Sequence, residues 1–372
     1  MQENDLKIFI GPTDTANMGA ILGDAFRQRG IKVTVVSIGI GPFQDGMRYD
    51  KVLTPDIWRL NKTQRLFKYL YGCLYCFIKY FPTHNVFIFL WGNTLLPLNL
   101  DLPIHKLFRK TTVMRFLGSD IRNHEALEAA AKKAGHKYYM SEELVAIDRE
   151  KSHLSLKQKR LMIRMVERYA TQIISGPQFS QLLTRPYHMV FVPLDINNIL
   201  YNNKPNPRPI VVHAPSNEAF KGTSYILKAV EQLKSEGYDF DFRLFRNMSN
   251  AKVRETLSSA DIAVDQLFVF SAGMFALEAM AAGCAVLGGN APEFSGFPKE
   301  LPIIHSNPDN LYQNLKMLLE KPDLRHELGE QGRKYVEKYH DHRKIADDYI
   351  RLIIKGEADI TYHSMQGSTV KC

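Results

Sequence analysis

The sequence contains few of the features that hold together a small secreted domain or a membrane protein. Four cysteines in 372 residues are too few for a disulfide framework, so we expect a reducing, cytoplasmic compartment. No run reaches about eighteen uncharged apolar residues, which excludes a transmembrane helix. The first residues show no basic segment followed by an apolar one, so no secretion signal is expected. One close pair, Cys73 and Cys76, has no second such pair beside it, which favours packed side chains over a zinc site.

The composition is that of an ordinary globular protein, with 45% hydrophobic and 23% charged residues. It excludes a disordered, collagen-like or coiled-coil chain. The length exceeds the roughly 150 residues of a typical domain, so two domains are expected.

The positive charge is confined to the first half of the chain. Residues 1–200 carry 27 Lys and Arg against 17 Asp and Glu, whereas residues 201–372 carry 21 against 22. The basic residues are scattered, and neither zinc-finger spacing nor an RNA-binding aromatic motif is present, so nucleic acid is not an expected partner. A phosphate-bearing substrate or an anionic membrane surface fits this half better.

Apolar stretches and helical patterns alternate along both halves, which predicts an α/β protein with doubly wound, mostly parallel sheets. In the first half we expect strands at 7–10, 32–38, 85–90, 111–116, 172–175 and 189–192, and helices at 18–29 and 156–170. In the second half we expect strands at 209–213, 240–245, 261–265 and 285–288, and helices at 222–235, 250–258, after Gly273, and at 308–319, 322–339 and 342–355. Asn307 and Pro308 are the expected N-cap and first residue of the helix at 308–319.

The expected domain boundary lies at residues 196–209, which contain five Asn and three Pro in fourteen residues. We therefore expect one Rossmann-like domain at 1–200, a second at 201–355, and a frayed tail at 356–372. Two such domains would face each other across a cleft, with ligands at the carboxyl ends of the strands.

Two segments of the second half carry chemical signals. In the first, a strand ending at His213 leads through Ser216 and Asn217 to Lys221 and Gly222 at the start of a helix, an arrangement that favours a phosphate. An ordinary capped helix with a solvated lysine is the alternative. In the second, Gly273 opens an apolar helix that contains Glu278. A buried carboxylate needs a partner, and a ribose diol fits, whereas a partly exposed glutamate is the alternative.

These two segments, with the later stretch LGEQGRKYVEKYHD, resemble glycosyltransferase family four. The resemblance is clear over residues 209–350 and thinner in the first half, where it rests on 85–96, 101–104, 113–122 and 192–195. It implies the GT-B fold and a retaining enzyme that uses a nucleotide-diphosphate sugar as donor substrate and no cofactor or metal.

Carried over by position, the resemblance assigns Lys221 to the donor diphosphate, Glu278 to the ribose, and Gly273, Met274 and Phe275 to the diphosphate and sugar. It places Gly118, Ser119 and Asp120 at the reacting centre, with Asp120 and Lys221 as the expected catalytic residues. Ser216, Asn217 and Gly222 complete the expected substrate site.

The chain departs from the family pattern at four points, one of which is the irregular glycine-rich loop after the first strand, with Asn17, Met18 and Gly19. Phe270 stands where the family has the first glutamate of a pair, and Leu117 stands where relatives commonly have histidine. The arginine that usually precedes the family's lysine has no equivalent in the loop at 214–217.

The expected function is therefore transfer of a hexosyl group to a glycan or lipid-linked acceptor in polysaccharide or glycoconjugate synthesis. The aromatic, lysine-containing run at 66–81 is typical of an interfacial helix or of a helix packed on the sheet, and the first reading adds the inner face of a membrane as a partner. A GT-B epimerase or phosphorylase, and a non-catalytic sugar-nucleotide-binding or scaffold protein, are the alternatives.

Overall fold

The computed structural model describes residues 2–371 except 42, 43, 45–47, 153, 203, 247 and 363–368. Two compact units account for the chain, and each is built on its own sheet. Unit 1 contains residues 1–127, 149–193 and 342–372, and unit 2 contains residues 128–148 and 194–341. Within the described ranges, no helix combines the length and the apolarity needed to cross a bilayer.

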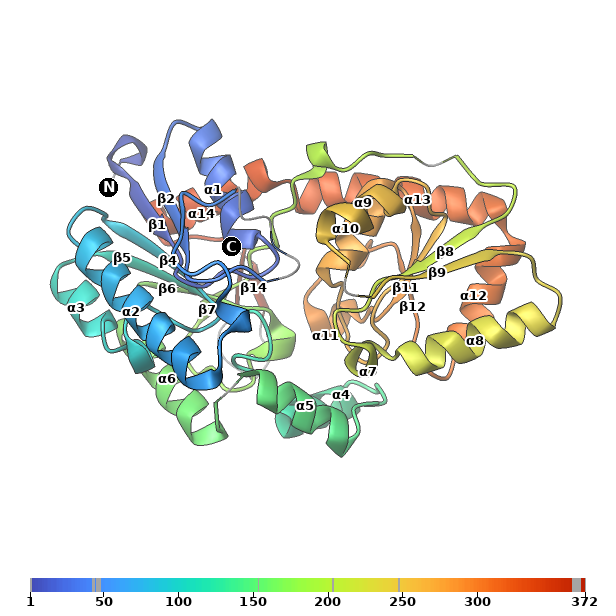
Figure 1. The fold of residues 1–372 in the computed structure, drawn as a ribbon, viewed down its shortest axis with the longest axis horizontal. Helices are drawn as coiled ribbons and strands as arrows, with labels where there is room; N and C mark the ends of the chain where they lie inside the picture. The colour runs from blue at the N-terminus through green and yellow to red at the C-terminus, as the bar shows by residue number, and fades with distance from the viewer. Residues whose placement is uncertain are drawn as a thin grey trace. The chain divides into compact units, whose positions relative to one another are not determined.

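Unit 1 contains a sheet in the order β14-β13-β7-β6-β5-β4-β1-β2-β3 (Figure 1). Its strands are parallel except around β13, which runs antiparallel to both of its neighbours. The strands are β1 (Lys7–Ile10), β2 (Lys32–Ser37), β3 (Lys51–Val52), β4 (Val86–Leu90), β5 (Thr111–Arg115), β6 (Gln172–Ile174), β7 (Tyr187–His188), β13 (Ile360–Tyr362) and β14 (Thr369–Lys371).

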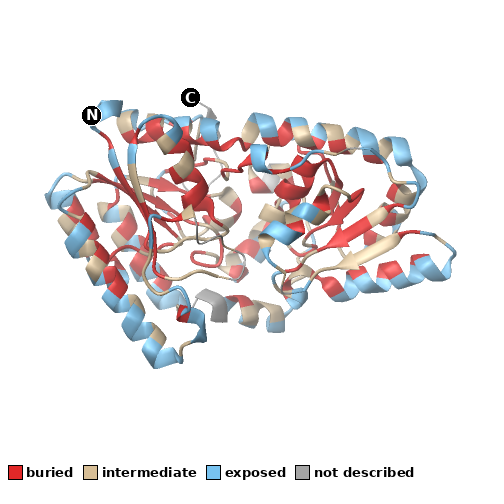
Figure 2. Ribbon diagram, turned by 45° about the horizontal axis from the view of Figure 1, so that its top comes forward, coloured by how far each residue is buried: buried red, intermediate tan, exposed pale blue. Residues whose placement is uncertain are grey.

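Helices cover both faces of this sheet because its central strands are apolar on both sides. In β1, Ile8 and Ile10 pack with α1 (Met18–Gln28) and α14 (His342–Lys355). Phe9 points the other way, into a core with α2 (Lys62–Tyr80), α3 (Leu102–Leu107) and α6 (Leu156–Tyr169). The central strands β4 and β5 are accordingly buried throughout, while the helices carry alternating buried and exposed stripes (Figure 2).

Unit 2 contains a parallel sheet in the order β12-β11-β10-β8-β9. The strands are β8 (Ile210–His213), β9 (Asp241–Leu244), β10 (Ile262–Val264), β11 (Ala285–Gly288) and β12 (Ile303–His305). The helices are α7 (Glu218–Lys221), α8 (Thr223–Ser235), α9 (Asn250–Leu257), α10 (Met274–Ala282), α11 (Pro292–Ser295), α12 (Leu311–Glu320) and α13 (Pro322–Tyr339). In Figure 1, α8 and α12 lie on one side of this sheet and α9, α10 and α13 on the other.

Three expectations about single elements were wrong. The strand expected at 189–192 is instead the short β7, because its partner β6 ends at Ile174, whose register partner is His188. The helix expected from Pro308 begins at Leu311, after a turn in which the Asn307 side chain accepts a hydrogen bond from the Asp309 N–H. The tail expected to fray supplies β13, which pairs with β7 and extends the sheet of unit 1. Four further elements were not predicted, namely α4 (His124–Lys133), α5 (Glu142–Ser152), β3 and β12.

The observed division of the chain differs from the expected boundaries in two places. Helix α14 belongs to unit 1, where Tyr349 lies in the core and its hydroxyl accepts a hydrogen bond from Arg115. Residues 128–148 belong to unit 2, where Tyr139 and Leu144 pack against the core. Amphipathic patterns show that a helix has an apolar face, but they do not say which sheet that face covers.

Candidate donor site

The topology of unit 2 singles out one point along its sheet. Strand β8 lies between β9 and β10, so the connections from β8 and from β10 leave the sheet in opposite directions. A crevice forms at such a switch point, outside the carboxyl ends of the strands, and ligands of doubly wound proteins bind there. The segments that follow β8 and β10 contain Lys221 and Asp265, respectively.

Lys221 is held at this point by groups from the segment after β10. Its Nζ donates to Asp265 Oδ1 over 3.0 Å and to Gln266 Oε1 over 2.7 Å. The lysine side chain is 13% exposed and the aspartate side chain 3% exposed. An ammonium group has three hydrogens, so one remains for a ligand. The arrangement therefore presents a fixed positive charge, as the sequence predicts for a phosphate site.

Gly273 lies beside this ion pair, immediately before α10. Its N–H donates to Asp265 Oδ2 over 3.2 Å. A Cβ atom at this position would lie 2.9 Å from Asp265 Oδ2 and 3.5 Å from Lys221 Nζ, so only glycine leaves the cluster intact. Met274 and Phe275, both half-buried, form the first turn of α10. The structure thus brings Lys221 and Gly273 together, with Met274 next in the chain.

The other expected phosphate ligands shape the backbone. Asn217 caps α7 by accepting a hydrogen bond from the Phe220 N–H over 2.8 Å. Gly222 joins α7 to α8 with φ of 79°, a conformation that favours glycine. Ser216 is exposed in the loop before them. The capped-helix alternative thus describes Asn217 and Gly222 well. Lys221 instead binds Asp265 and Gln266, which follow the neighbouring strand β10.

His213, at the end of β8, is a structural residue. Its Nδ1 lies 2.8 Å from the Val264 carbonyl oxygen, which can only accept, so Nδ1 carries the hydrogen. Its Nε2 then accepts from the Thr223 hydroxyl over 2.9 Å. Burial lowers the pKa of His213 to about 4, so the ring is neutral and joins β8, β10 and α8.

Glu278 is buried in α10, as an apolar helix around it predicts. Both carboxylate oxygens accept from the Asn250 side-chain amide, over 2.9 and 3.1 Å. Burial raises the pKa of this carboxyl, and the hydrogen bond from Asn250 and the charge of Arg254 oppose that shift. The partly exposed alternative is wrong, because the side chain is 4% exposed. Its partner in the structure is α9.

Phe270 stands where the resembling family has a glutamate, and its side chain lies in an apolar cluster. It packs with Ala131, Ala291 and Tyr138, and its ring centroid lies 5.3 Å from that of His136. Three of these four neighbours come from the segment at 128–148. A carboxylate at position 270 would be removed from water among apolar neighbours, whereas an aromatic side chain packs there.

Further hydrogen bonds attach the segment at 128–148 to the rest of unit 2. Asp309, just before α12, accepts hydrogen bonds from Lys137 Nζ and from the Tyr139 hydroxyl, each over 2.8 Å. No motif marks these residues in the sequence, since their partners lie about 170 positions away.

The expected residues of the first half form a separate loop after β5 in unit 1. The Asp120 carboxylate accepts hydrogen bonds from the N–H groups of Leu117, Gly118 and Ile121, at 2.7 to 3.2 Å. Burial raises the pKa of this carboxyl to about 6. The Ser119 carbonyl accepts from the buried Lys159 over 2.6 Å. Asp120 therefore holds the loop in its conformation.

Two further charged residues were not predicted. Asp14, after β1, accepts hydrogen bonds from the N–H groups of Gly19 and Ala20 and from the Tyr49 hydroxyl, and burial raises the pKa of its carboxyl. Arg246, after β9, forms a bidentate ion pair with Glu218 of α7. It supplies an arginine beside the helix of Lys221, although the preceding loop has none.

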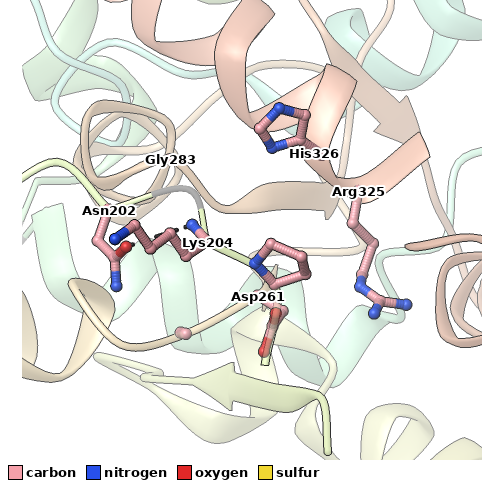
Figure 3. A pocket seen from close by; sticks show the side chains of 8 residues that line it. Asn202, Lys204, Asp261, Gly283, Arg325 and His326 are labelled. Carbon is pink, nitrogen blue, oxygen red and sulfur yellow. Dashed lines mark hydrogen bonds between the residues drawn. The ribbon is translucent and has the colours of Figure 1, made fainter. Parts of the chain in front are cut away.

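A small pocket of unit 2 lies at the other end of the strands (Figure 3). Its lining includes Asp261, which precedes β10 and accepts hydrogen bonds from Asn206 and from the Ile210 N–H. Arg325 lines it too and donates to the Leu318 carbonyl. The bonds to Asp261 attach the asparagine-rich stretch, which was expected to be a linker, to unit 2. The pocket therefore lies between this stretch and the amino ends of the strands.

Comparison with known proteins agrees with this architecture. Residues 225–351 match the family model described as glycosyl transferase-like. A search of curated proteins found no match. Sucrose-phosphate synthase from Thermosynechococcus elongatus is 15% identical, with a TM-score of 0.62 over 94% of this chain and 95% of that one.

Two other solved structures are similar over the same extent. HepE from Anabaena, in complex with UDP-glucose, is 14% identical, with a TM-score of 0.56 over 93% of this chain and 98% of that one. WaaG, a glycosyltransferase involved in lipopolysaccharide biosynthesis, is 14% identical, with a TM-score of 0.51 over 94% of this chain and 100% of that one. At these identities the likeness shows the fold. These structures confirm the expected GT-B fold, and the glycosyl transferase-like match covers residues 225–351 of the chain.

Proposed function

We propose that this protein is a retaining, family-four-like glycosyltransferase that moves a hexosyl group from a nucleotide-diphosphate sugar to a hydroxyl of a glycan or lipid-linked acceptor. The observation that carries the proposal is the Lys221–Asp265–Gly273 cluster at the switch point of unit 2. A cation with an unused hydrogen beside the start of a helix is suited to a diphosphate. HepE binds UDP-glucose, so uridine diphosphate is the first nucleotide to test.

The proposed step requires little acid–base chemistry from the protein. The bond between the anomeric carbon and the diphosphate oxygen breaks while the acceptor oxygen bonds to the same face of that carbon. The acceptor proton passes to the departing phosphate oxygen. Lys221 stabilises the charge that develops on the diphosphate, and preorganised groups of this kind contribute several kcal/mol. Glu278 would hold the ribose hydroxyls, with Asn250 as its partner in their absence.

The proposed setting is the synthesis of a polysaccharide or glycoconjugate in the cytoplasm, at the inner face of a membrane. WaaG acts in lipopolysaccharide biosynthesis, which is why a lipid-linked acceptor is preferred to a free sugar. The basic balance of the first half supports an anionic surface as a partner.

A panel of nucleotide diphosphates and their sugars tests the donor. The matching nucleotide should raise the melting temperature by mass action, and the matching sugar nucleotide should be consumed when acceptor is supplied. With an α-linked donor, the anomeric proton coupling of the product should show an α linkage. A β-linked product would refute retention. Binding without any sugar release would favour a non-catalytic binder, and an isomerised sugar without acceptor would favour an epimerase.

A further inference from the structure

Helix α2 of unit 1 is apolar on two opposite faces. One face packs on the sheet through Cys73, Cys76 and Tyr80. The opposite face, which we call the α2 surface, consists of Leu66, Phe67, Leu70, Tyr71, Leu74 and Ile78, and all six side chains are exposed. Phe67 is 69% exposed and Ile78 is 66% exposed. At about 100° per residue these six positions fall within an arc of roughly 140°, so they form one continuous stripe.

Two further exposed aromatic side chains lie near the ends of the helix. Before it, the exposed Trp58 lies 5.2 Å from the guanidinium group of Arg65, measured to the ring centroid. After it, Phe81 contacts the exposed Phe108, with ring centroids 5.5 Å apart. Exposed apolar side chains gathered on one face of a folded protein mark an interaction site.

The charges around the stripe are mostly positive. Residues 56–119 contain nine Lys and Arg and two acidic residues, Asp56 and Asp101. Asp101 is fully buried, and Asp56 pairs with Arg59, so neither carboxylate offsets the lysines of α2. Lys62, Lys68 and Lys79 lie on α2 itself and are exposed.

This combination identifies the partner. Apolar side chains flanked by lysines, with Trp and Tyr among them, match the boundary between the acyl chains and the anionic headgroups of a bilayer. A second copy of the chain fits poorly, because self-association through this stripe would bring two sets of lysines together. We propose that the α2 surface docks on an anionic lipid bilayer, with the helix axis in the plane of the interface. The inference deepens the proposed function, because it names the surface that would meet a lipid-linked acceptor.

Vesicle sedimentation without donor or acceptor tests the inference independently of sugar transfer. The wild-type chain should bind vesicles of phosphatidylcholine mixed with phosphatidylglycerol, bind phosphatidylcholine alone far less, and dissociate as salt is raised. Phe67→Ser and Ile78→Ser should each lower the partition coefficient by about tenfold. Leu227→Ser, an exposed leucine on α8 of unit 2, is the matched control and should bind as the wild type does.

A second variant guards against misfolding. Lys62→Gln/Lys68→Gln leaves the apolar stripe intact and should abolish the preference for anionic vesicles while the melting temperature is unchanged. Donor hydrolysis in solution should be the same in all these variants, so a failure to bind lipid is distinct from a failure of the proposed activity. Wild-type protein that ignores anionic vesicles would overturn the inference. So would a dimer that dissociates in Phe67→Ser, since the stripe would then join two copies of the chain.

Discussion

The loop after β5 in unit 1 and the loop after β10 in unit 2 each contain a buried aspartate, and they use it differently. Asp120 accepts its hydrogen bonds from neighbouring backbone N–H groups, all within three residues. Asp265 pairs with Lys221, which is 44 residues away, and with the Gly273 N–H. A carboxylate saturated by its own loop fixes a backbone conformation. A carboxylate that orients a distant cation, and leaves that cation a free hydrogen, prepares a place for a ligand.

This difference divides the residues that the family resemblance had grouped together. The donor-side residues Lys221 and Gly273 form a cluster with chemical capacity, whereas Gly118, Ser119 and Asp120 form a scaffold within unit 1. Substitutions that remove the charge of a side chain but preserve its shape can distinguish the roles of the two loops.

The largest effect is expected at Lys221. Lys221→Ala should lower the rate of sugar transfer by about 10²–10³ because the developing diphosphate charge loses its cation. It should also destabilise unit 2 by about 3 kcal/mol, since Asp265 is left buried and unpaired. Melting temperatures and initial rates, compared with those of the exposed Lys228→Ala, measure both effects.

The double variant Lys221→Ala/Asp265→Asn separates these two consequences. The amide removes the unpaired charge and still accepts from the Gly273 N–H, so stability should return while transfer stays slow. Recovery of activity together with stability would show that Lys221 serves the fold alone.

The same contrast explains how much of the structure could be predicted from the sequence. The strands at 7–10 and 285–288 and the helices at 322–339 and 342–355 were predicted to the residue, because burial imposes regular periods. Lys221 could be singled out from the sequence because its motif consists of neighbouring residues. Its partners Asp265 and Gln266 could not be predicted, since the pairing depends on the order of β8 and β10 in the sheet. The placement of α14 and of residues 128–148 failed for the same reason.

The next effect concerns the scaffold role of Asp120. Its pKa is about 6 in the fold against 3.8 for an ordinary aspartate. The folded state therefore binds the proton more tightly, and the contribution of Asp120 to stability falls as pH rises from 4 to 6. By linkage the fall over this range is about 2 kcal/mol. Asparagine does not titrate in this range, so the wild type should lose stability relative to Asp120→Asn as the pH rises from 4 to 6.

Unfolding by urea at several pH values measures this change. Asp309→Asn in unit 2 is the control with the opposite sign. Lys137 holds the pKa of the Asp309 carboxyl below its usual value, so the wild type should gain slightly on this variant as pH rises. A stability difference for Asp120→Asn that stays constant from pH 4 to 6 would contradict the burial of an ionised carboxylate in this loop.

The smallest effect is expected at Glu278, which tests whether unit 2 contains a second ligand-binding group or another scaffold residue. Glu278→Gln keeps an acceptor for the Asn250 amide and removes a charge whose burial raises the pKa of the carboxyl. The melting temperature without ligand should therefore stay flat or rise. If the carboxylate binds the ribose, nucleotide affinity should fall by about 1–3 kcal/mol, measured by calorimetry.

Asn250→Ala supplies the matched comparison, because it breaks the bond to α9 and leaves the carboxylate in place. If Glu278 serves only to join α10 to α9, Asn250→Ala should destabilise the unliganded protein and neither variant should change nucleotide affinity. If it binds ribose, Asn250→Ala should keep most of the affinity that Glu278→Gln loses. A 2′-deoxy nucleotide diphosphate then isolates the contact. The wild type should discriminate against it and Glu278→Gln should do so much less, whereas equal discrimination by the two proteins would leave Glu278 as a scaffold carboxylate, like Asp120.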